Sequence, residues 1–368
     1  MVGVIYGTTG ELIKLAPVLV ELESRGATPL MWCTGQQAQQ IPSFQRDLRL
    51  PDVAVWLRGG ADDSDLDHKR QVPGWALEVI WTVWMRRRAL RQALSADGHK
   101  PFLLVHGDTM TTVLGALAGK LLRLPVGHIE AGMRSGDWRN PFPEEINRRT
   151  AAKLVGVHYA PGSVAVTNLE REHVKGEIVD TKQNTIRDAL TLALDSTLTA
   201  IEPPAEPFGL VSIHRFELIE RDQLLRPLLE LLREHSRRQP LLFVDHSTTK
   251  AVIDADPALR ALFDDRFRRV PRQPYLQFIA LLKRADFLVS DSGGSQEESA
   301  MLGLPCLIHR AVSEHETGLG ETVVLSRLDL DVVRDFLAEP SRWRTDVQSM
   351  SLGPTKIIVD DLARRGVI

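Results

Sequence analysis

The stretch Ser290-Asp-Ser-Gly-Gly-Ser-Gln-Glu-Glu298 decides the fold of this chain of 368 residues. The mostly apolar run Asp286–Ser290 that leads into it predicts a buried strand, and residues Gln296–Leu302 predict a helix. The two glycines between them permit other groups to approach the backbone closely. A strand, a glycine-rich turn and a helix in this order are typical of an α/β domain with a parallel sheet.

The same stretch predicts an anion site. The backbone amides of Ser292, Gly293 and Gly294 would stand at the helix N-terminus, where the partial positive charge of the helix dipole favours phosphate. Glu298, in the first turns of the helix, would accept hydrogen bonds from ribose hydroxyls. An ordinary glycine-rich turn explains these residues equally well when they are taken alone.

Strands and helices alternate on both sides of this stretch. In the first half, short apolar strands are predicted at Val2–Tyr6, Pro29–Cys33, Phe102–His106 and Pro125–Glu130. In the second half, they are predicted at Phe208–Ile213, Pro240–Val244, Asp286–Ser290 and Pro305–His309. Short apolar strands separated by helices indicate parallel sheets that are covered on both faces.

The length of the chain indicates two domains, because it is too long for one ordinary hydrophobic core. We expect an α/β fold with a Rossmann-like domain over residues 1–178 and a second over residues 179–368. The two domains would face one another across a cleft, which is the preferred place for a ligand in such architectures.

Composition excludes several classes of protein. Apolar residues make up 43% of the chain and charged residues 25%, as in soluble globular proteins. A net charge of −3 shows no basic excess, so we expect no nucleic-acid partner. No run reaches the roughly 18 apolar residues of a membrane span, and Met1–Tyr6 resembles a buried strand instead of a signal peptide. Cys33 and Cys306 lie in apolar runs and are predicted to be free thiols of a cytoplasmic protein.

Two further groups have mainly structural interpretations. The acidic loop with Asp62, Asp63, Asp65 and Asp67 fits a solvated surface better than a metal site, because it has no fixed ligand spacing. One predicted helix carries three tryptophans and three arginines, namely Trp75, Trp81, Trp84 and Arg86–Arg88. This pattern favours a partly buried helix or a dimer face over membrane or nucleic-acid binding.

Carboxylates follow two strands of the first half. Glu130 ends a strand, so its side chain should face the carboxyl edge of the sheet. Asp108 also follows a strand, although an N-cap of the next helix is almost as good an interpretation. Glu144 and Arg148 stand one helical turn apart, where the alternative is a weak surface ion pair.

One histidine follows the first strand of the second half. A lone histidine is usually structural, but His214 is predicted at the carboxyl end of the strand, facing the expected cleft. Because imidazole titrates near neutral pH, a histidine in this place is a good candidate for proton transfer.

Together these segments resemble the non-hydrolysing UDP-N-acetylglucosamine 2-epimerases, a family with the two-Rossmann GT-B fold. Residues Gly7–Pro17 look like the family opening GTRPEAIKMAP. Four further motifs occur in the family's order, namely Gly107-Asp-Thr, His128–Arg134, Pro141–Arg148 and Asp291–Glu298.

The resemblance implies a reaction and a set of residues. UDP would be eliminated across C1–C2 of UDP-N-acetylglucosamine and would add back after C2 is reprotonated on the opposite face, with no metal or other cofactor. The implied catalytic residues are Asp108, Glu130, Glu144 and His214. The implied substrate-binding residues are Lys14, Arg148, Phe278, Ser292, Gly293, Gly294 and Glu298. The resemblance also implies a homodimer.

Several positions depart from the family pattern. Thr9, Phe216 and His315 stand where the family has arginines, which predicts weaker or differently arranged pyrophosphate contacts. Thr34–Gln37 and His246–Thr249 also differ from the motifs that bind a second, activating substrate molecule in bacterial members. These differences argue against allosteric activation by the substrate.

Three rival functions remain open. A hydrolysing relative would release free N-acetylmannosamine and UDP, although the intact Asp291–Glu298 segment argues against it. A glycosyltransferase of the same fold would not need the carboxylates around Glu130 and Glu144. The third rival is a UDP-sugar-binding homologue that lost its activity together with its arginines.

Overall fold

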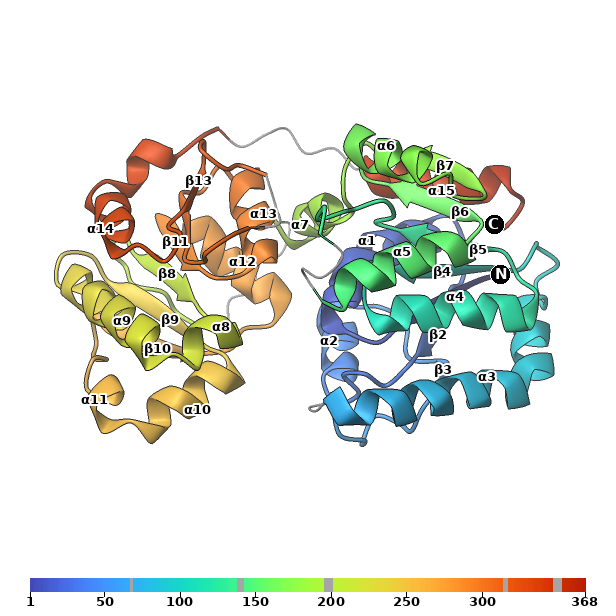
Figure 1. The fold of residues 1–368 in the computed structure, drawn as a ribbon, viewed down its shortest axis with the longest axis horizontal. Coiled ribbons are helices and arrows are strands. Elements are labelled where there is room, and N and C mark those ends of the chain that lie inside the picture. The colour runs from blue at the N-terminus through green and yellow to red at the C-terminus, as the bar shows by residue number, and fades with distance from the viewer. Residues whose placement is uncertain (67–68, 138–141, 195–200, 314–316, 347–352) are drawn as a thin grey trace. The chain divides into compact units, whose positions relative to one another are not determined.

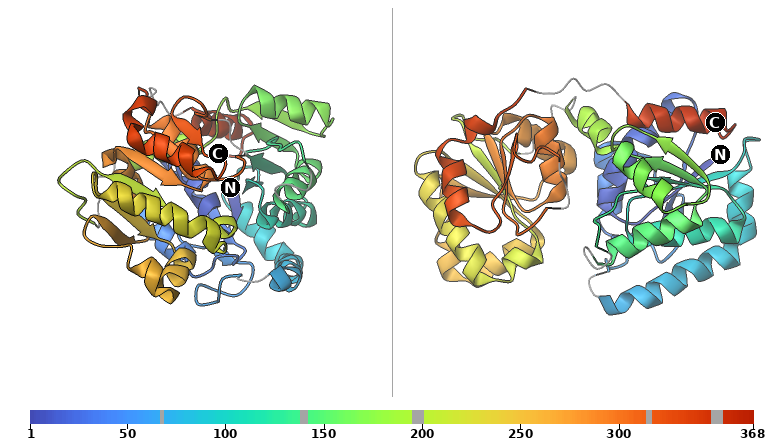
Figure 2. Two further views of the ribbon diagram at one scale, coloured as in Figure 1. Left: turned by 60° about the vertical axis from the view of Figure 1, so that its left-hand side comes forward. Right: turned by 45° about the horizontal axis from the view of Figure 1, so that its top comes forward.

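The computed structural model describes residues 1–66, 69–137, 142–194, 201–313, 317–346 and 353–368 (Figure 1). Asp67, Pro141 and His315, on which parts of the sequence interpretation rest, lie outside these residues. The chain forms two compact units, Met1–Leu192 with Ser351–Ile368, and Ala193–Met350. This division differs from the predicted one at residue 178, because residues 179–192 and the last helix of the chain both belong to the first unit (Figure 2).

Unit 1 is built on a seven-stranded parallel sheet with the strand order β3-β2-β1-β4-β5-β6-β7. The strands are β1 (Val2–Tyr6), β2 (Leu30–Cys33), β3 (Val55–Trp56), β4 (Phe102–His106), β5 (Val126–Ile129), β6 (Val157–Ala160) and β7 (Glu177–Asp180). The helices are α1 (Thr9–Ser24), α2 (Ile41–Leu48), the short η1 (Lys69–Gln71), α3 (Val72–Leu94), α4 (Met110–Leu122), α5 (Glu144–Leu154), α6 (Ser163–Arg171), α7 (Ile186–Leu194) and α15 (Pro354–Arg364).

Alternating side chains of the central strands fill two separate cores. Val4 and Tyr6 of β1 pack in one core with α1 and α15, whereas Ile5 packs in the other with α3 and α4. Both faces of the sheet are therefore buried, which explains why its central strands are almost wholly apolar. The buried Cys33 and Cys306 are free thiols, as predicted.

Unit 2 repeats this plan with a six-stranded parallel sheet in the order β10-β9-β8-β11-β12-β13. The strands are β8 (Gly209–Ser212), β9 (Leu241–Asp245), β10 (Phe267–Pro271), β11 (Phe287–Ser290), β12 (Cys306–Ile308) and β13 (Val323–Leu325). The helices are α8 (Phe216–Ile219), α9 (Asp222–Ser236), α10 (Ser247–Ala255), α11 (Pro257–Arg260), α12 (Tyr275–Arg284), α13 (Gly293–Met301), α14 (Leu330–Ala338) and the short η2 (Pro340–Trp343).

The strand order reverses in each unit beside its first strand. In unit 1, β1 lies between β2 and β4, and in unit 2, β8 lies between β9 and β11. The loops after β1 and β4, and after β8 and β11, therefore leave the sheet in opposite directions and open a crevice at its carboxyl edge. The predicted α/β class with two Rossmann-like sheets is confirmed. No helix within the described residues combines the length and the apolar character that crossing a bilayer requires.

Candidate functional site

Glu130 lies directly after β5 and is held by three partners. The Nζ atom of Lys14 on α1 lies 2.7 Å from Glu130 Oε1, and Asn184 Nδ2 donates to the same oxygen at 2.6 Å. His106 Nδ1 at the end of β4 lies 3.6 Å from Glu130 Oε2. The backbone of Glu130 has a φ of 69°, a left-handed conformation that is uncommon outside glycine. Strain of this kind is often found at functional sites.

The charge of this cluster is fixed by burial and by Lys14. Burial disfavours ionisation of Glu130, but the adjacent ammonium of Lys14 outweighs it and lowers the carboxyl pKa to about 2. Burial also lowers the pKa of His106 to about 3, so its imidazole is neutral at neutral pH. At neutral pH the ion pair of this cluster is therefore the one between Lys14 and Glu130.

Asp108 follows β4 and is bound by the helix that begins at Glu144. Arg148 donates to Asp108 Oδ2 from Nη2 at 2.6 Å and from Nε at 3.0 Å. Asn147 Nδ2 donates to the Asp108 carbonyl at 2.9 Å. The N-cap of α4 is Thr109 and not Asp108, because the Thr109 hydroxyl accepts from the amide of Thr112. The capping interpretation of Asp108 is therefore wrong, and its carboxylate is paired with Arg148 instead.

The loop that carries Asp108 passes close to Glu130. A Cβ atom added to Gly107, which precedes Asp108, would lie 3.5 Å from Glu130 Oε2. The pKa of Arg148 is raised because, against the effect of burial, it feels the negative charges of Asp108, Glu130 and Glu145. Two ion pairs, Lys14 with Glu130 and Arg148 with Asp108, thus lie at one part of the carboxyl edge.

Glu144 and its neighbour Glu145 differ in their surroundings. Glu144 Oε2 is buried and accepts no hydrogen bond from any residue that the structure describes. Glu145 is fully buried and binds Arg149 Nε at 2.9 Å and the Ser135 amide at 3.2 Å. Arg148 bonds to Asp108 and Glu145, so the alternative interpretation of Glu144 and Arg148 as a surface ion pair does not hold.

Glu11 is a buried carboxylate that the sequence interpretation did not single out. It accepts from the amides of Gly7 and Thr8, each at 2.9 Å, and from the Thr109 hydroxyl at 2.6 Å. Glu11 therefore joins the loop after β1 to the loop that carries Asp108. Burial raises its pKa to about 7, and these hydrogen bonds oppose the rise. The capping-box spacing of Thr8 and Glu11 was the signal that could have revealed it.

In unit 2, Asp291 organises the loop after β8. Its carboxylate accepts from the amides of His214 and Arg215 at 2.9 to 3.1 Å. The rings of His214 and His246 lie 4.5 Å apart, and His246 Nε2 lies 3.0 Å from Ser212 Oγ. Burial lowers the pKa of His214 and brings that of His246 to about 3.

The turn before α13 is closed by a local bond, in which the Ser292 amide donates to Ser290 Oγ at 3.2 Å. Ser292 is the N-cap of α13 and makes no side-chain capping hydrogen bond. A Cβ atom on Gly294 would meet nothing closer than Ser292 Oγ at 3.8 Å. Glu298 is buried on α13, and its charge helps burial to raise the pKa of Tyr275 on α12. Phe278, the predicted neighbour of the base, lies one turn further along α12 and is half-buried.

Three sequence comparisons point to one family. The model of a family described as UDP-N-acetylglucosamine 2-epimerase matches residues 90–350. The chain is similar to the UDP-N-acetylglucosamine 2-epimerase of Salmonella typhimurium, with 32% identity over 84% of this chain and 82% of that protein. It is also similar to the enzyme of that name from Escherichia coli K12, with 30% identity over 94% of this chain and 92% of that protein.

Solved structures agree with the sequence comparisons. The UDP-GlcNAc 2-epimerase of Neisseria meningitidis bound to UDP-GlcNAc is similar, with a TM-score of 0.76, 25% identity and 99% coverage of both chains. The UDP-GlcNAc 2-epimerase of Methanocaldococcus jannaschii in complex with UDP-GlcNAc and UDP gives a TM-score of 0.73, 25% identity and 99% coverage of both chains.

Proposed function

The chain belongs to the UDP-N-acetylglucosamine 2-epimerase family, and from this premise we propose that it is a non-hydrolysing epimerase that interconverts UDP-N-acetylglucosamine and UDP-N-acetylmannosamine. The observation that carries the proposal is the gathering of Glu130, Asp108, Lys14 and Arg148 at one carboxyl edge of unit 1. The alternatives are a hydrolysing epimerase and an inactive UDP-sugar-binding homologue.

The proposed reaction begins at C1 because the C2 hydrogen, which is not next to a carbonyl, is not acidic. The β-phosphate oxygen of UDP leaves C1 with the bonding electron pair, a base removes the C2 proton, and a C1=C2 bond forms in 2-acetamidoglucal. A proton then reaches C2 from the opposite face, and the UDP oxygen bonds to C1 again. This sequence requires stabilisation of positive charge at C1 and two proton-transferring groups at C2.

The three carboxylates suit different parts of this chemistry. A carboxylate with a pKa of about 2 is a weak base, so we assign stabilisation of the positive charge at C1 to Glu130. Asp108 and Glu144 are the proposed proton-transferring groups on the two faces. Oε2 of Glu144 accepts no hydrogen bond from the described residues, which supports a proton-transferring role for Glu144, because a proton acceptor needs a free lone pair.

Unit 2 supplies the proposed site for UDP. The amides of Ser292, Gly293 and Gly294 at the start of α13 would bind the diphosphate, and Glu298 would bind the ribose. Phe278 would lie near the uracil. His214, kept neutral by burial, would donate a hydrogen bond to the leaving diphosphate. No metal or other cofactor takes part in this proposal.

The assembly state and compartment are also proposed. We expect a homodimer that uses the exposed tryptophans of α3, Trp81 and Trp84. We expect a cytoplasmic protein, since the two free buried thiols, Cys33 and Cys306, suit a reducing compartment.

Incubation of the enzyme with UDP-GlcNAc in D2O, followed by proton NMR, tests the proposal. We expect a mixture of UDP-GlcNAc and UDP-ManNAc in which the C2 hydrogen is replaced by deuterium, with no free reducing sugar. Accumulation of free N-acetylmannosamine and UDP would identify the hydrolysing alternative instead. A substrate that keeps its C2 hydrogen would leave only the binding homologue.

A further inference from the structure

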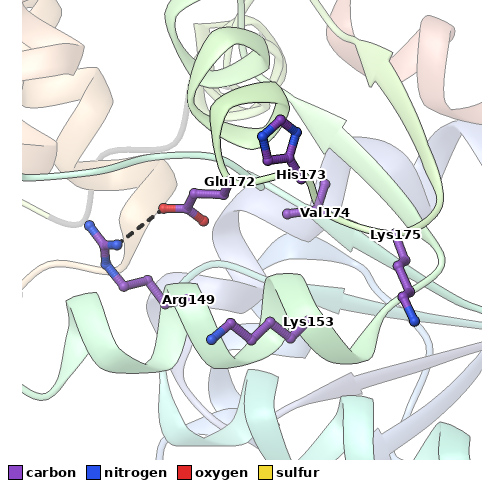
Figure 3. Close-up of a pocket in the computed structure, with 6 residues that line it drawn as sticks. All are labelled: Arg149, Lys153, Glu172, His173, Val174 and Lys175. Carbon is purple, nitrogen blue, oxygen red and sulfur yellow. Dashed lines mark ion pairs between the residues drawn. The ribbon is translucent and has the colours of Figure 1, made fainter.

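A surface hollow of about 470 Å³ lies on unit 1, outside the proposed catalytic residues (Figure 3). Two elements line it. Arg149 and Lys153 come from α5, and Glu172, His173, Val174 and Lys175 come from the turn between α6 and β7. Figure 3 shows the carboxylate of Glu172 pointing towards Arg149, with Lys153 lying along α5 beside them.

The hollow keeps a positive charge. Its lining includes the cations Arg149, Lys153 and Lys175, with Glu172 as their carboxylate neighbour. Both oxygens of Glu172 are bound by Arg134, at 2.8 and 2.7 Å. Hydrogen bonding from Arg134 lowers the pKa of Glu172, and the charges of Arg149 and Lys153 lower it further. Within the described part of the chain, Lys153 and Lys175 form no ion pair, so their ammonium groups are open to an anion.

The backbone of the turn has a defined shape. His173 takes a left-handed conformation with a φ of 49°, and its amide donates to the Glu170 carbonyl at 3.0 Å. Val174 then packs against the small apolar core beneath α6. The basic side chains therefore belong to a hydrogen-bonded turn and to a helix, both packed against the unit, and not to an unstructured loop.

One lining residue is connected to the proposed catalytic carboxylate. Arg149 lies 2.9 Å from Glu145 Oε1 and 3.3 Å from Glu172 Oε1. Glu145 also lies 3.5 Å from Arg148 Nη1, and Arg148 binds Asp108 at 2.6 Å. An anion that attracts Arg149 would weaken its bond to Glu145. Glu145 could then draw Arg148 away from Asp108, because both carboxylates compete for the same guanidinium.

We infer that this hollow binds a phosphate or diphosphate group and that its occupation changes the turnover rate through Arg149, Glu145 and Arg148. A guanidinium and two ammonium groups around a small open hollow match a compact, multiply charged oxyanion. Free phosphate and the phosphate of a small metabolite share this chemistry. The binding part stands on the hollow alone, whereas the rate effect rests on the proposed function.

Titration of the full chain with inorganic phosphate, inorganic pyrophosphate and N-acetylglucosamine 1-phosphate tests the binding, with heat or the 31P signal as the readout. The titration is made both without UDP and with UDP present, so that binding at the proposed UDP site of unit 2 is separated from binding at the hollow. We expect pyrophosphate to bind with a Kd of about 1 mM or below at low salt and more weakly as salt rises. Tighter binding of the sugar phosphate would indicate a metabolite, and tighter binding of the inorganic anions would indicate phosphate itself.

The matched variants are Lys153→Ala with Lys175→Ala, and, as a control, Lys120→Ala with Lys356→Ala at two other exposed lysines of unit 1. We expect the first pair to weaken pyrophosphate binding at least tenfold and the control pair to leave it unchanged. Equal binding in both pairs, or no saturable binding to the unaltered chain, would overturn the site.

Turnover measured with and without pyrophosphate then tests the rate effect. We expect a change of severalfold in kcat in the unaltered chain and in the control pair, and none in the Lys153/Lys175 pair. An unchanged kcat in an active enzyme that binds the anion would overturn the coupling. Anion binding by a chain with no epimerase activity would instead refute the proposed function and leave the site standing.

Discussion

At the scale of single residues, position after a strand was the most informative sequence signal. Asp108 and Glu130 could be singled out because each comes within two residues of the end of an apolar strand, and parallel strands bring their carboxyl ends to one edge. Asn184 and Glu145 could not, because their importance comes from partners far away in the sequence or from complete burial. The sequence pattern does not determine which distant side chain will meet Glu130.

Removal of either carboxylate charge tests the proposed catalytic set. We expect Asp108→Asn and Glu130→Gln each to lower kcat by a factor of about 10³ or more. The first variant loses a proposed proton-transferring group, and the second loses the negative charge proposed to stabilise C1. UDP binding should change less than about threefold, because the proposed UDP site lies in unit 2. Calorimetry with UDP and the D2O exchange assay give the two readouts. Undiminished exchange in both variants would refute their catalytic role.

Glu11 makes a separate prediction about stability and pH. Its pKa of about 7 in the folded protein lies above the usual value of 4.5, so the ionised form is disfavoured by folding. The cost is absent below about pH 4.5, grows as pH rises, and is complete above about pH 7, where it amounts to about 3 kcal/mol. Glu11→Gln cannot ionise, so we expect its stability relative to the unaltered chain to improve between pH 5 and pH 8.

Urea unfolding at the two pH values measures this change. Tryptophan fluorescence is a suitable signal, since Trp32 and Trp75 are buried in unit 1. Glu130→Gln is the matched comparison, because the low pKa of Glu130 gives stability that is lost only as pH falls from about 4.5 to about 2. A difference between Glu11→Gln and the unaltered chain that does not vary with pH would contradict the prediction.

At the scale of helices and strands, the sequence predicted central strands better than edge strands. The apolar runs at β1, β4, β8 and β11 were recognised because both faces of these strands are buried. All four edge strands, β3, β7, β10 and β13, were missed, and so was the internal strand β6. The strand β3 has only two residues, and β10 carries two arginines between apolar residues, so neither gives a continuous apolar signal.

A substitution at the start of α13 should weaken UDP binding without changing the stability of the protein. A methyl group on Gly294 has free space in the structure, so we expect Gly294→Ala to unfold within about 2 °C of the unaltered chain. The same methyl group would occupy space next to the amides proposed to bind diphosphate, and we expect UDP to bind about tenfold more weakly. Gly156→Ala is the control, because a Cβ atom there also meets nothing. Equal UDP affinity in the two variants would exclude Gly294 from the site.

The exposed apolar side chains of α3 predict that the protein is a dimer. Leu77, Trp81, Trp84 and Met85 are 72%, 61%, 44% and 57% exposed along its outer side. Exposed apolar side chains gathered on one helix favour contact with a second molecule. We expect light scattering to give twice the 41.1 kDa of one chain for the unaltered protein and 41.1 kDa for Trp81→Asp with Trp84→Asp. Val164→Asp, at an exposed apolar residue on α6, should leave the mass unchanged. A mass of one chain for the unaltered protein would refute the dimer.

At the scale of the whole molecule, two Rossmann-like units could be predicted but not the path of the chain between them. The alternation of strands and helices repeats in both halves, so the fold class was readable from the sequence. The return of α15 to unit 1 was not, because Ile358 and Val359 would look equally suited to any apolar surface. That these residues pack on α1, and not on another apolar surface, is seen only in the folded protein.

The return of α15 to unit 1 can be tested at Asp188. It is fully buried on α7, and its carboxylate accepts from the amides of Gly353 at 3.2 Å and Thr355 at 2.7 Å, at the start of α15. Asp188→Ala would leave the buried amide of Thr355 and the partly buried amide of Gly353 without this acceptor. It would also remove the cap of the helix, so we expect unit 1 to lose about 2 kcal/mol of stability in urea unfolding. Asp360→Ala removes an exposed ion pair between α15 and Arg25, which directly follows α1, and should cost less than about 1 kcal/mol. If the two variants lost equal stability, the buried cap would not be what holds α15, and apolar packing on α1 alone would account for the return of the chain.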